Sequence, residues 1–272
     1  MRDVKTLLSM GALCAFSALP GACKDKPKVD LAPVASAALS AAPAATTALQ
    51  FSVDASSSKV TFLMDSPLEK IDGDASGGLS GDIFLDPSDV TKSTALVKVD
   101  LQKLVLYQQK RADDKGEYGA RTKSDLQNQH ARNWLQIEPL EGEVTAEQAE
   151  ANRWVELKIE KIENASVANV AAETGAQRTF TATASGEFRL HGRKQMKSAK
   201  VEVTVNYAGD KPQSIHVKTV EPLRIGLEEF EVNPRDNAGK FVKSVTEALS
   251  SNLKGKVAQE APLVLDFTAN AK

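Results

Sequence analysis

The sequence predicts an all-β domain, either a sandwich or a closed antiparallel barrel. Apolar and polar residues alternate with a period of two in many short runs, which is typical of half-buried strands. Turn residues such as Gly192 and Arg193 separate these runs, and about eight to ten strands in one domain favour these two architectures. The alternating runs are residues 60–62, 95–101, 155–159, 180–184, 188–190 and 201–205, and further strands are expected at 79–86, 215–227 and 263–269.

Two segments depart from this period and predict short helices packed on the sheet. Ser124 with Gln127 three residues later forms a capping box, and Leu126, His130 and Trp134 then share one helical face. A second amphipathic stripe precedes Gly255, a C-cap candidate, and consists of Phe241, Val245, Ala248, Leu249 and Leu253. The polar segment 142–152 is expected to be an inserted loop or a short helical excursion.

The N-terminal residues 1–22 are typical of a signal peptide for export. Arg2 and Lys5 precede an apolar run over residues 6–19, and small residues lead up to Cys23. This stretch resembles a lipobox, in which the cysteine carries a lipid, although Pro20 stands where that pattern prefers leucine. The alternative is ordinary cleavage near Ala22 with an incidental cysteine. We therefore expect an exported, periplasmic protein that is attached to a membrane by a lipid on Cys23.

The next segment has the composition of a flexible linker. Residues 23–48 hold the lipid attachment site and are rich in alanine and proline without an apolar period, which predicts a disordered tether. The folded domain is then expected to span residues 49–272.

Composition excludes several classes of function. Thirty-four Lys and Arg against 36 Asp and Glu give a formal charge of −2, which offers no excess of positive charge to a nucleic acid. Only Cys14 and Cys23 occur, so a thiolate nucleophile or a cysteine metal site is excluded after residue 23. We expect no catalysis, no cofactor and no metal.

Three weaker signals are interpreted structurally. Residues 72–77 resemble the first half of a calcium loop, but Ile83 stands where the bidentate glutamate belongs, so a hairpin loop is favoured. The three histidines, His130, His191 and His216, are expected in separate elements. Gly78-Leu79-Ser80-Gly81 falls short of a nucleophile elbow.

Several motifs together resemble the YceI-like family. Each is short and degenerate, and together they cover residues 49–272. They are Phe51-Ser52-Val53-Asp54 followed by residues 58–62, Ile71-Asp72-Gly73 with residues 80–87 as the next hairpin, residues 128–135 as a helical turn, residues 186–192 as a strand and turn, and residues 261–267 as the closing strand. The resemblance implies a lipocalin-like antiparallel β-barrel of about eight strands with one or two short packed helices.

The resemblance also implies a ligand, a polyisoprenoid or a similar amphiphilic lipid held in an apolar tunnel. A barrel of eight strands either fills with its own side chains or encloses one elongated ligand. Ten apolar residues are expected to face inward, as tunnel wall or as collapsed core: Val60, Phe62, Val97, Val99, Leu157, Ile159, Phe180, Phe188, Val201 and Val203.

The expected function is therefore non-catalytic binding, sequestration or transport of such a lipid. The alternative is a lipid-free module of the cell envelope that binds another protein through an exposed edge or loop. Lys110, Arg111 and Arg121 lie in the polar segment 108–128, which is either a headgroup-binding rim or a solvated loop. The sequence carries no signal for oligomeric state.

Overall fold

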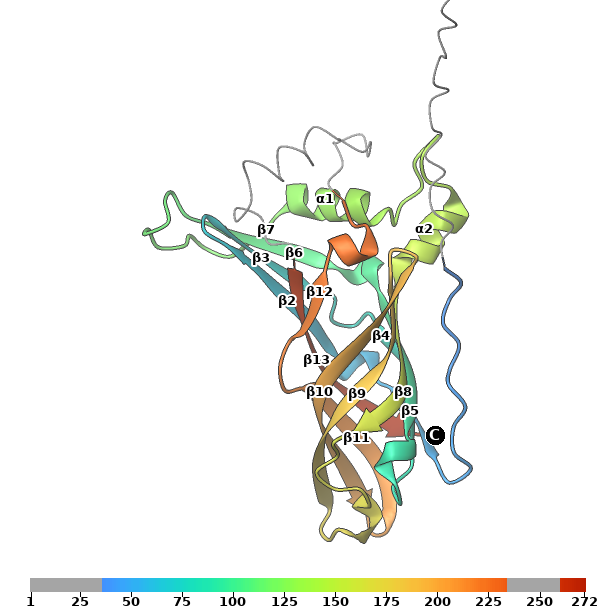
Figure 1. Cartoon of the computed structure of the whole chain (residues 1–272). Helices are drawn as coiled ribbons and strands as arrows, with labels where there is room; N and C mark the ends of the chain where they lie inside the picture. Colours follow the sequence, from blue (N-terminus) through green and yellow to red (C-terminus); the bar gives the residue numbers. More distant parts are fainter. Residues whose placement is uncertain (1–35, 234–259) are drawn as a thin grey trace, which may run out of the picture. The chain divides into compact units, whose positions relative to one another are not determined.

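An eight-stranded antiparallel barrel is the centre of the computed structural model, which describes residues 36–233 and 260–272. The strands follow one another around the ring in the order β1, β4, β5, β8, β9, β10, β11 and β13, and β13 pairs back to β1 (Figure 1). The predicted lipocalin-like all-β barrel is confirmed. The ring strands are β1 (Leu49–Val53), β4 (Leu79–Leu85), β5 (Thr94–Asp100), β8 (Trp154–Glu163), β9 (Gln177–Leu190), β10 (Arg193–Ala208), β11 (Lys211–Thr219) and β13 (Glu260–Ala271).

The sheet branches at β13, which widens one end of the barrel. The C-terminal half of β13 pairs with β1 and β11, whereas its N-terminal half pairs with β2 and β12. From β2 the sheet continues through β3 and β6 to β7, which projects away from the ring (Figure 1). These strands are β2 (Lys59–Ser66), β3 (Glu69–Asp74), β6 (Val105–Lys110), β7 (Thr122–Lys123) and β12 (Leu223–Gly226).

Alternation along the ring strands places apolar side chains inside. In β10, Val201, Val203 and Val205 are buried while the residues between them are partly exposed. Two details differ from the sequence prediction. Residues 215–227 form two strands, because Glu221 and Pro222 interrupt them. Residues 72–77 are not a hairpin loop, because residues 72–74 are the end of β3 and the chain then leads to β4, which does not pair with β3.

Both described α-helices lie at the wide end, which we call the helical end. Helix α1 (Asp125–Leu135) begins after Ser124, whose hydroxyl accepts a hydrogen bond from the Gln127 amide. The other hydrogen bond of a capping box, from the Ser124 amide to the Gln127 side chain, is absent. The Gln127 side chain donates to Glu69 instead. Helix α2 (Ala146–Arg153) has a full capping box between Thr145 and Gln148, so residues 142–152 include the helical excursion. The predicted helix around residues 241–253 lies outside the described residues.

Two short 3₁₀ helices plug the opposite end of the barrel, which we call the plugged end. They are η2 (Val90–Lys92) and η4 (Val170–Ala172), and Val90 and Val170 are fully buried. The Val90 amide donates to the carbonyl of Ala168, which joins the two loops. The remaining 3₁₀ helices are η1 (Ala55–Ser57), η3 (Leu101–Lys103) and η5 (Glu228–Phe230).

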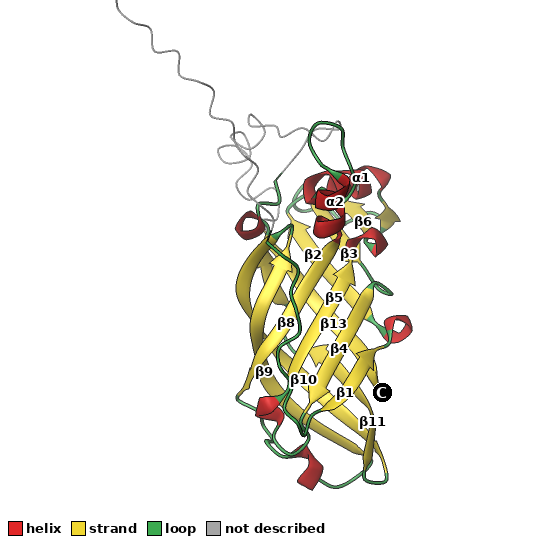
Figure 2. Cartoon of the chain, turned by 90° about the vertical axis from the view of Figure 1, so that its right-hand side faces the viewer, coloured by secondary structure: helices red, strands yellow, loops and turns green. Residues whose placement is uncertain are grey.

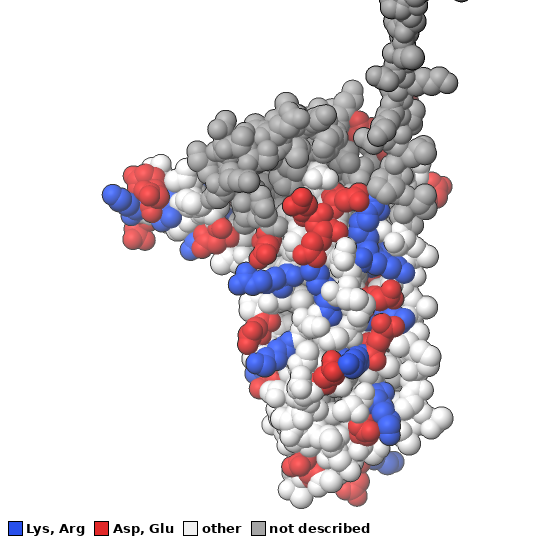
Figure 3. All heavy atoms as spheres, in the orientation of Figure 1, with Lys and Arg blue, Asp and Glu red and all other residues white. Residues whose placement is uncertain are grey.

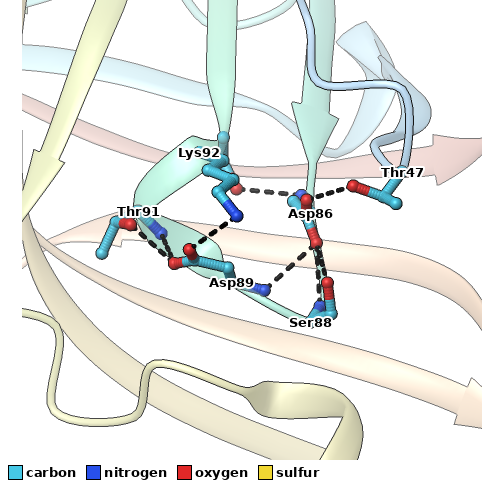
Figure 4. A network of polar contacts seen from close by, with 7 residues as sticks. Thr47, Asp86, Ser88, Asp89, Thr91 and Lys92 are labelled. Carbon is cyan, nitrogen blue, oxygen red and sulfur yellow. Dashed lines mark hydrogen bonds and ion pairs between the residues drawn. The ribbon is translucent and has the colours of Figure 1, made fainter.

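A carboxylate network shapes the loop at the plugged end. Asp86 is buried and accepts hydrogen bonds from Ser88, from the Asp89 amide and from the Thr47 hydroxyl (Figure 4). Burial by itself raises the pKa of Asp86, but the hydrogen bonds from Ser88 and Thr47 outweigh it and lower the pKa below its ordinary value. The ionised carboxylate therefore anchors both the loop before η2 and the chain segment that contains Thr47.

That segment corrects the expected tether. Residues 36–48 lie along the outer barrel wall, and Leu39 is buried against it (Figure 2). This segment has no apolar period, but it still packs on the wall through one buried side chain, Leu39, and through hydrogen bonds of its backbone. Their partners are Glu156 and Arg189 of the barrel wall. We call residues 36–47 the strap. The expected signal peptide, Cys23 and the rest of the tether lie outside the described residues.

Candidate functional site

The barrel encloses an apolar cavity between the plugged end and mid-height. This barrel cavity has a volume of about 100 Å³. Since about 10–15 Å³ suffices for one water molecule, the interior is hollow rather than filled, and its apolar wall does not favour water. Seven of the eight ring strands contribute to the wall, among others through Ile83, Val97, Leu157, Phe180, Ala182, Ala184, Ala199, Val201, Val217 and Phe267.

A larger cavity occupies the helical end. This mouth cavity has a volume of about 290 Å³ and lies between the ring, the branch of the sheet and α1. Its wall includes Val60, Phe62 and Met64 of β2, Ile71 of β3, Val99 of β5, Val155 of β8, Phe188 and Leu190 of β9, Ile225 of β12 and Leu263 of β13. Phe188 is held edge-on by Phe230 of η5, with ring centroids 5.4 Å apart.

The two cavities adjoin along three strands. On β5, Val97 lines the barrel cavity and Val99 the mouth cavity, and these are consecutive inward positions. The same step occurs between Leu157 and Val155 on β8 and between Leu265 and Leu263 on β13. Two residues of strand span about 6.6 Å, so the two cavities lie end to end along these strands, and together we call them the tunnel.

All ten inward residues predicted from the sequence lie on this wall. Six line the barrel cavity (Val97, Leu157, Ile159, Phe180, Val201 and Val203) and four line the mouth cavity (Val60, Phe62, Val99 and Phe188). That they contact a ligand stays a prediction. Sequence reasoning missed the wall contributed by β3, β6 and η3, because each of these elements has only one or two inward apolar residues and no clear period.

Helix α1 covers part of the mouth cavity. Its inner face presents Gln127, His130, Ala131, Trp134 and Leu135 to the cavity, and the His130 ring is stacked parallel to Trp134. The sequence predicted that Leu126, His130 and Trp134 share the inner face, but Leu126 is exposed, so the inner face is rotated slightly from the predicted one. The cavity therefore combines a hydrocarbon wall with a few polar groups at its helical end.

Asn128 fastens α1 to the sheet. Its buried side chain accepts a hydrogen bond from the Leu106 amide at 2.9 Å and donates to the Leu106 carbonyl at 2.9 Å. Leu106 of β6 lines the mouth cavity, so this pair of bonds fixes the distance between helix and sheet.

Replacing Asn128 with alanine is expected to loosen this cover. The Leu106 amide would lose its hydrogen bond to Asn128, and the Leu106 carbonyl would keep only the bond from the Ser124 amide, at a cost of about 2 kcal/mol in the free energy of unfolding. Urea denaturation measures that cost, and hydrogen exchange of α1 amides should accelerate. The matched control is Gln129→Ala, which changes the exposed neighbouring residue. Equal stability and equal exchange in the two variants would contradict this role.

An ion pair supports the wall of the mouth cavity. Asp100 accepts two hydrogen bonds from Arg153, at 2.8 and 2.6 Å, and also caps η3, which carries the cavity residue Leu101. The Arg153 guanidinium lowers the pKa of Asp100 below 3.8, and Asp100 in turn raises the pKa of Arg153.

The lowered pKa of Asp100 predicts acid sensitivity. A carboxyl group whose folded pKa is below its unfolded value stabilises the fold above about pH 4, and this contribution is lost as the pH falls through the folded pKa. Asp100→Asn should therefore destabilise the protein at pH 7 and lose less further stability than the wild type between pH 5 and pH 2. Urea midpoints across this interval measure the difference, and parallel curves for both proteins would contradict it.

The three candidate headgroup cations do not line the tunnel. Arg111 donates to the Pro67 carbonyl and lies over the Tyr118 ring, while Arg121 pairs with Asp72 at 3.6 Å and lies over Tyr107. Lys110 is exposed at the end of β6. On the face shown in Figure 3, acidic and basic side chains alternate without a large patch of one sign.

The histidines lie apart, as expected. His130 is in α1, His191 contacts Gln136 and the Phe230 carbonyl, and His216 pairs with Asp266 at 2.7 Å. His191 occupies the β9–β10 turn rather than a strand. Within residues 36–233 and 260–272, no group of three or more His, Cys, Asp or Glu side chains is arranged to hold a metal. In the same ranges, no helix has the length and apolarity that crossing a bilayer requires.

Comparison with solved structures identifies a protein of the same architecture. A polyisoprenoid binding domain from Saccharophagus degradans, implicated in plant cell wall breakdown, superposes with a TM-score of 0.50 at 16% sequence identity. The match covers 82% of this chain and 99% of that domain. The chain has the fold of that binding domain. The predicted resemblance in fold is thereby confirmed, while no family model matches the sequence and no curated protein is significantly similar to it.

Proposed function

We propose that this protein binds a polyisoprenoid or a similar amphiphilic lipid by enclosing its hydrocarbon chain in the tunnel, without a covalent step. The observation that carries the proposal is that the two apolar cavities adjoin end to end along β5, β8 and β13. One end of this space is plugged by Val90 and Val170, which suits a ligand with one apolar end. The shared fold with a polyisoprenoid binding domain supports the same class of ligand.

Burial of apolar surface supplies the binding energy in this proposal. Each methylene group that leaves water contributes about 0.8 kcal/mol, so affinity should rise steeply with chain length until the tunnel is full. The polar groups of Glu69, Gln127 and His130 lie at the mouth cavity only, so the ligand's polar end is placed there. The barrel cavity then receives the tail.

The proposed setting is the periplasmic face of a membrane. A signal peptide over residues 1–22 and a lipid on Cys23 would export the protein and keep it beside a source of membrane lipids. The lipid would then be sequestered or carried by the barrel.

Tryptophan fluorescence tests the binding. The chain has two tryptophans, and Trp134 lines the mouth cavity, so Trp154→Phe leaves a single reporter inside the proposed site. Titration with prenyl alcohols of increasing length should shift the Trp134 emission, with affinity rising up to a limiting length. An emission that does not respond to any prenyl chain would overturn the proposal and favour a lipid-free module that binds a protein.

A further inference from the structure

The strap is held on the outer barrel wall by two buried charges. Glu156 of β8 and Arg189 of β9 point outward from neighbouring strands, yet their side chains are only 1% and 2% exposed. Arg189 Nε donates to the Ser36 carbonyl at 3.1 Å, and the Leu39 amide donates to Glu156 Oε2 at 2.8 Å. The wall thus binds the backbone of the strap directly.

These contacts make the strap an integral part of the barrel. The Glu156 carboxylate also pairs with Lys98 at 2.7 Å and with Arg189 at 3.3 Å, so the strap amide completes a cluster of charges around a buried carboxylate. A buried charge that loses a partner is strongly destabilising, which keeps the strap in place. Leu39, only 5% exposed, adds apolar contact at the same point.

The strap runs the length of the barrel, from the plugged end to the helical end (Figures 1 and 2). Thr47 contacts Asp86 at the plugged end, whereas the Ser36 amide donates to the Gly192 carbonyl in the β9–β10 turn. The adjacent His191 contacts Gln136, the residue that ends α1. The chain therefore meets the barrel beside the helix that covers the mouth cavity, although β1 itself begins at the plugged end.

We propose that the strap turns the mouth of the tunnel toward the membrane that holds the protein. This inference rests on the lipid anchor of the proposed function. Ser36 is thirteen residue steps from Cys23, so this linker spans at most about 45 Å, measured from the helical end. Without the strap, the linker would be 26 steps long and would end at Leu49, at the opposite end. The partner surface is a lipid bilayer, and the exposed Leu68 and Leu126, next to the hydrogen-bonded Glu69 and Gln127, are the apolar side chains that would meet it.

Energy transfer to a labelled bilayer tests the orientation in the full lipidated chain. Because Cys23 would carry the lipid and Cys14 would leave with the signal peptide, a single introduced cysteine can be labelled. Leu126→Cys marks the helical end, and Asp210→Cys marks the β10–β11 turn at the other end. In vesicles of phosphatidylethanolamine and phosphatidylglycerol with headgroup acceptors, transfer from position 126 should be several-fold greater than from position 210.

Releasing the strap should remove this difference. Leu39→Asp places a charge beside the buried Glu156, and Thr47→Ala removes the hydrogen bond to Asp86, so together they should release the strap and bring transfer from the two positions close together. Ala38→Asp adds the same charge at an exposed neighbouring position and should preserve the difference. Circular dichroism on the same samples verifies that the barrel is folded, and a strap-release variant that fails to fold is replaced by Thr47→Ala alone, which should reduce the difference.

The proposed orientation and the proposed binding function can be rejected independently of each other. Equal transfer from both positions in the unaltered strap, greater transfer from position 210, or an unlipidated Cys23 by mass spectrometry would each overturn the orientation. Prenyl binding is measured in the same vesicles through Trp134. A clear difference in transfer together with absent prenyl uptake would keep the orientation and reject the proposed function.

Discussion

Ala184→Phe is expected to abolish tight binding of long prenyl chains while leaving short chains unaffected. Ala184 is buried on β9 and lines the barrel cavity, where a phenyl ring would occupy the space proposed for the ligand tail. If the ring excludes about five methylene-sized groups, binding weakens by about 4 kcal/mol, roughly a thousandfold in Kd. A short chain confined to the mouth cavity should bind as before. Titration of Trp134 fluorescence with chains of two lengths measures both effects.

The neighbouring Thr183 provides the matched control for this substitution. Thr183 lies on the same strand with its side chain on the outer face, so Thr183→Phe adds the same ring outside the tunnel. Its affinity for long chains should equal that of the wild type. If Ala184→Phe binds long chains as tightly as this control, the ligand does not enter the barrel cavity.

Glu156→Gln is expected to destabilise the fold by about 3–5 kcal/mol, because it leaves the buried Arg189 guanidinium next to a neutral group. The strap should loosen at the same time, since the Leu39 amide binds this carboxylate. Urea denaturation gives the free energy, and hydrogen exchange of the Leu39 amide reports on the strap.

Glu160→Gln is the control for this prediction. Glu160 also lies on the outer face of β8 and pairs with Lys158 at 2.6 Å, but its side chain is 38% exposed. An exposed pair of this kind contributes at most about 1 kcal/mol. Similar losses of stability in the two variants would show that the buried charge cluster does not hold the strap.

The ring strands could be predicted because each is buried on one face only. Alternation in residues 95–101, 155–159 and 201–205 corresponds to β5, β8 and β10, and the inward residues follow directly. The branch was harder to predict. In strand β3 only one apolar side chain, Ile71, faces the mouth cavity, so its sequence shows no alternation of apolar and polar residues.

Two features of the site depend on contacts between distant parts of the chain. Glu156 and Arg189 have the positions of ordinary outward charges, and only the approach of residues 36–39, more than 110 residues away from Glu156, buries them. The hollow interior also could not be predicted from the sequence, since apolar inward residues are equally compatible with a filled core and with a tunnel. Spatial packing decides between the two, and the sequence pattern does not encode it.

A lipid held in the tunnel should accompany the protein through purification. The most direct measurement is to produce residues 24–272, purify them without detergent, extract the protein with organic solvent and identify the released lipid by mass spectrometry. We expect one isoprenoid or related amphiphilic species near one molecule per chain. A protein that carries no lipid and also fails to take up added prenyl lipids would contradict it.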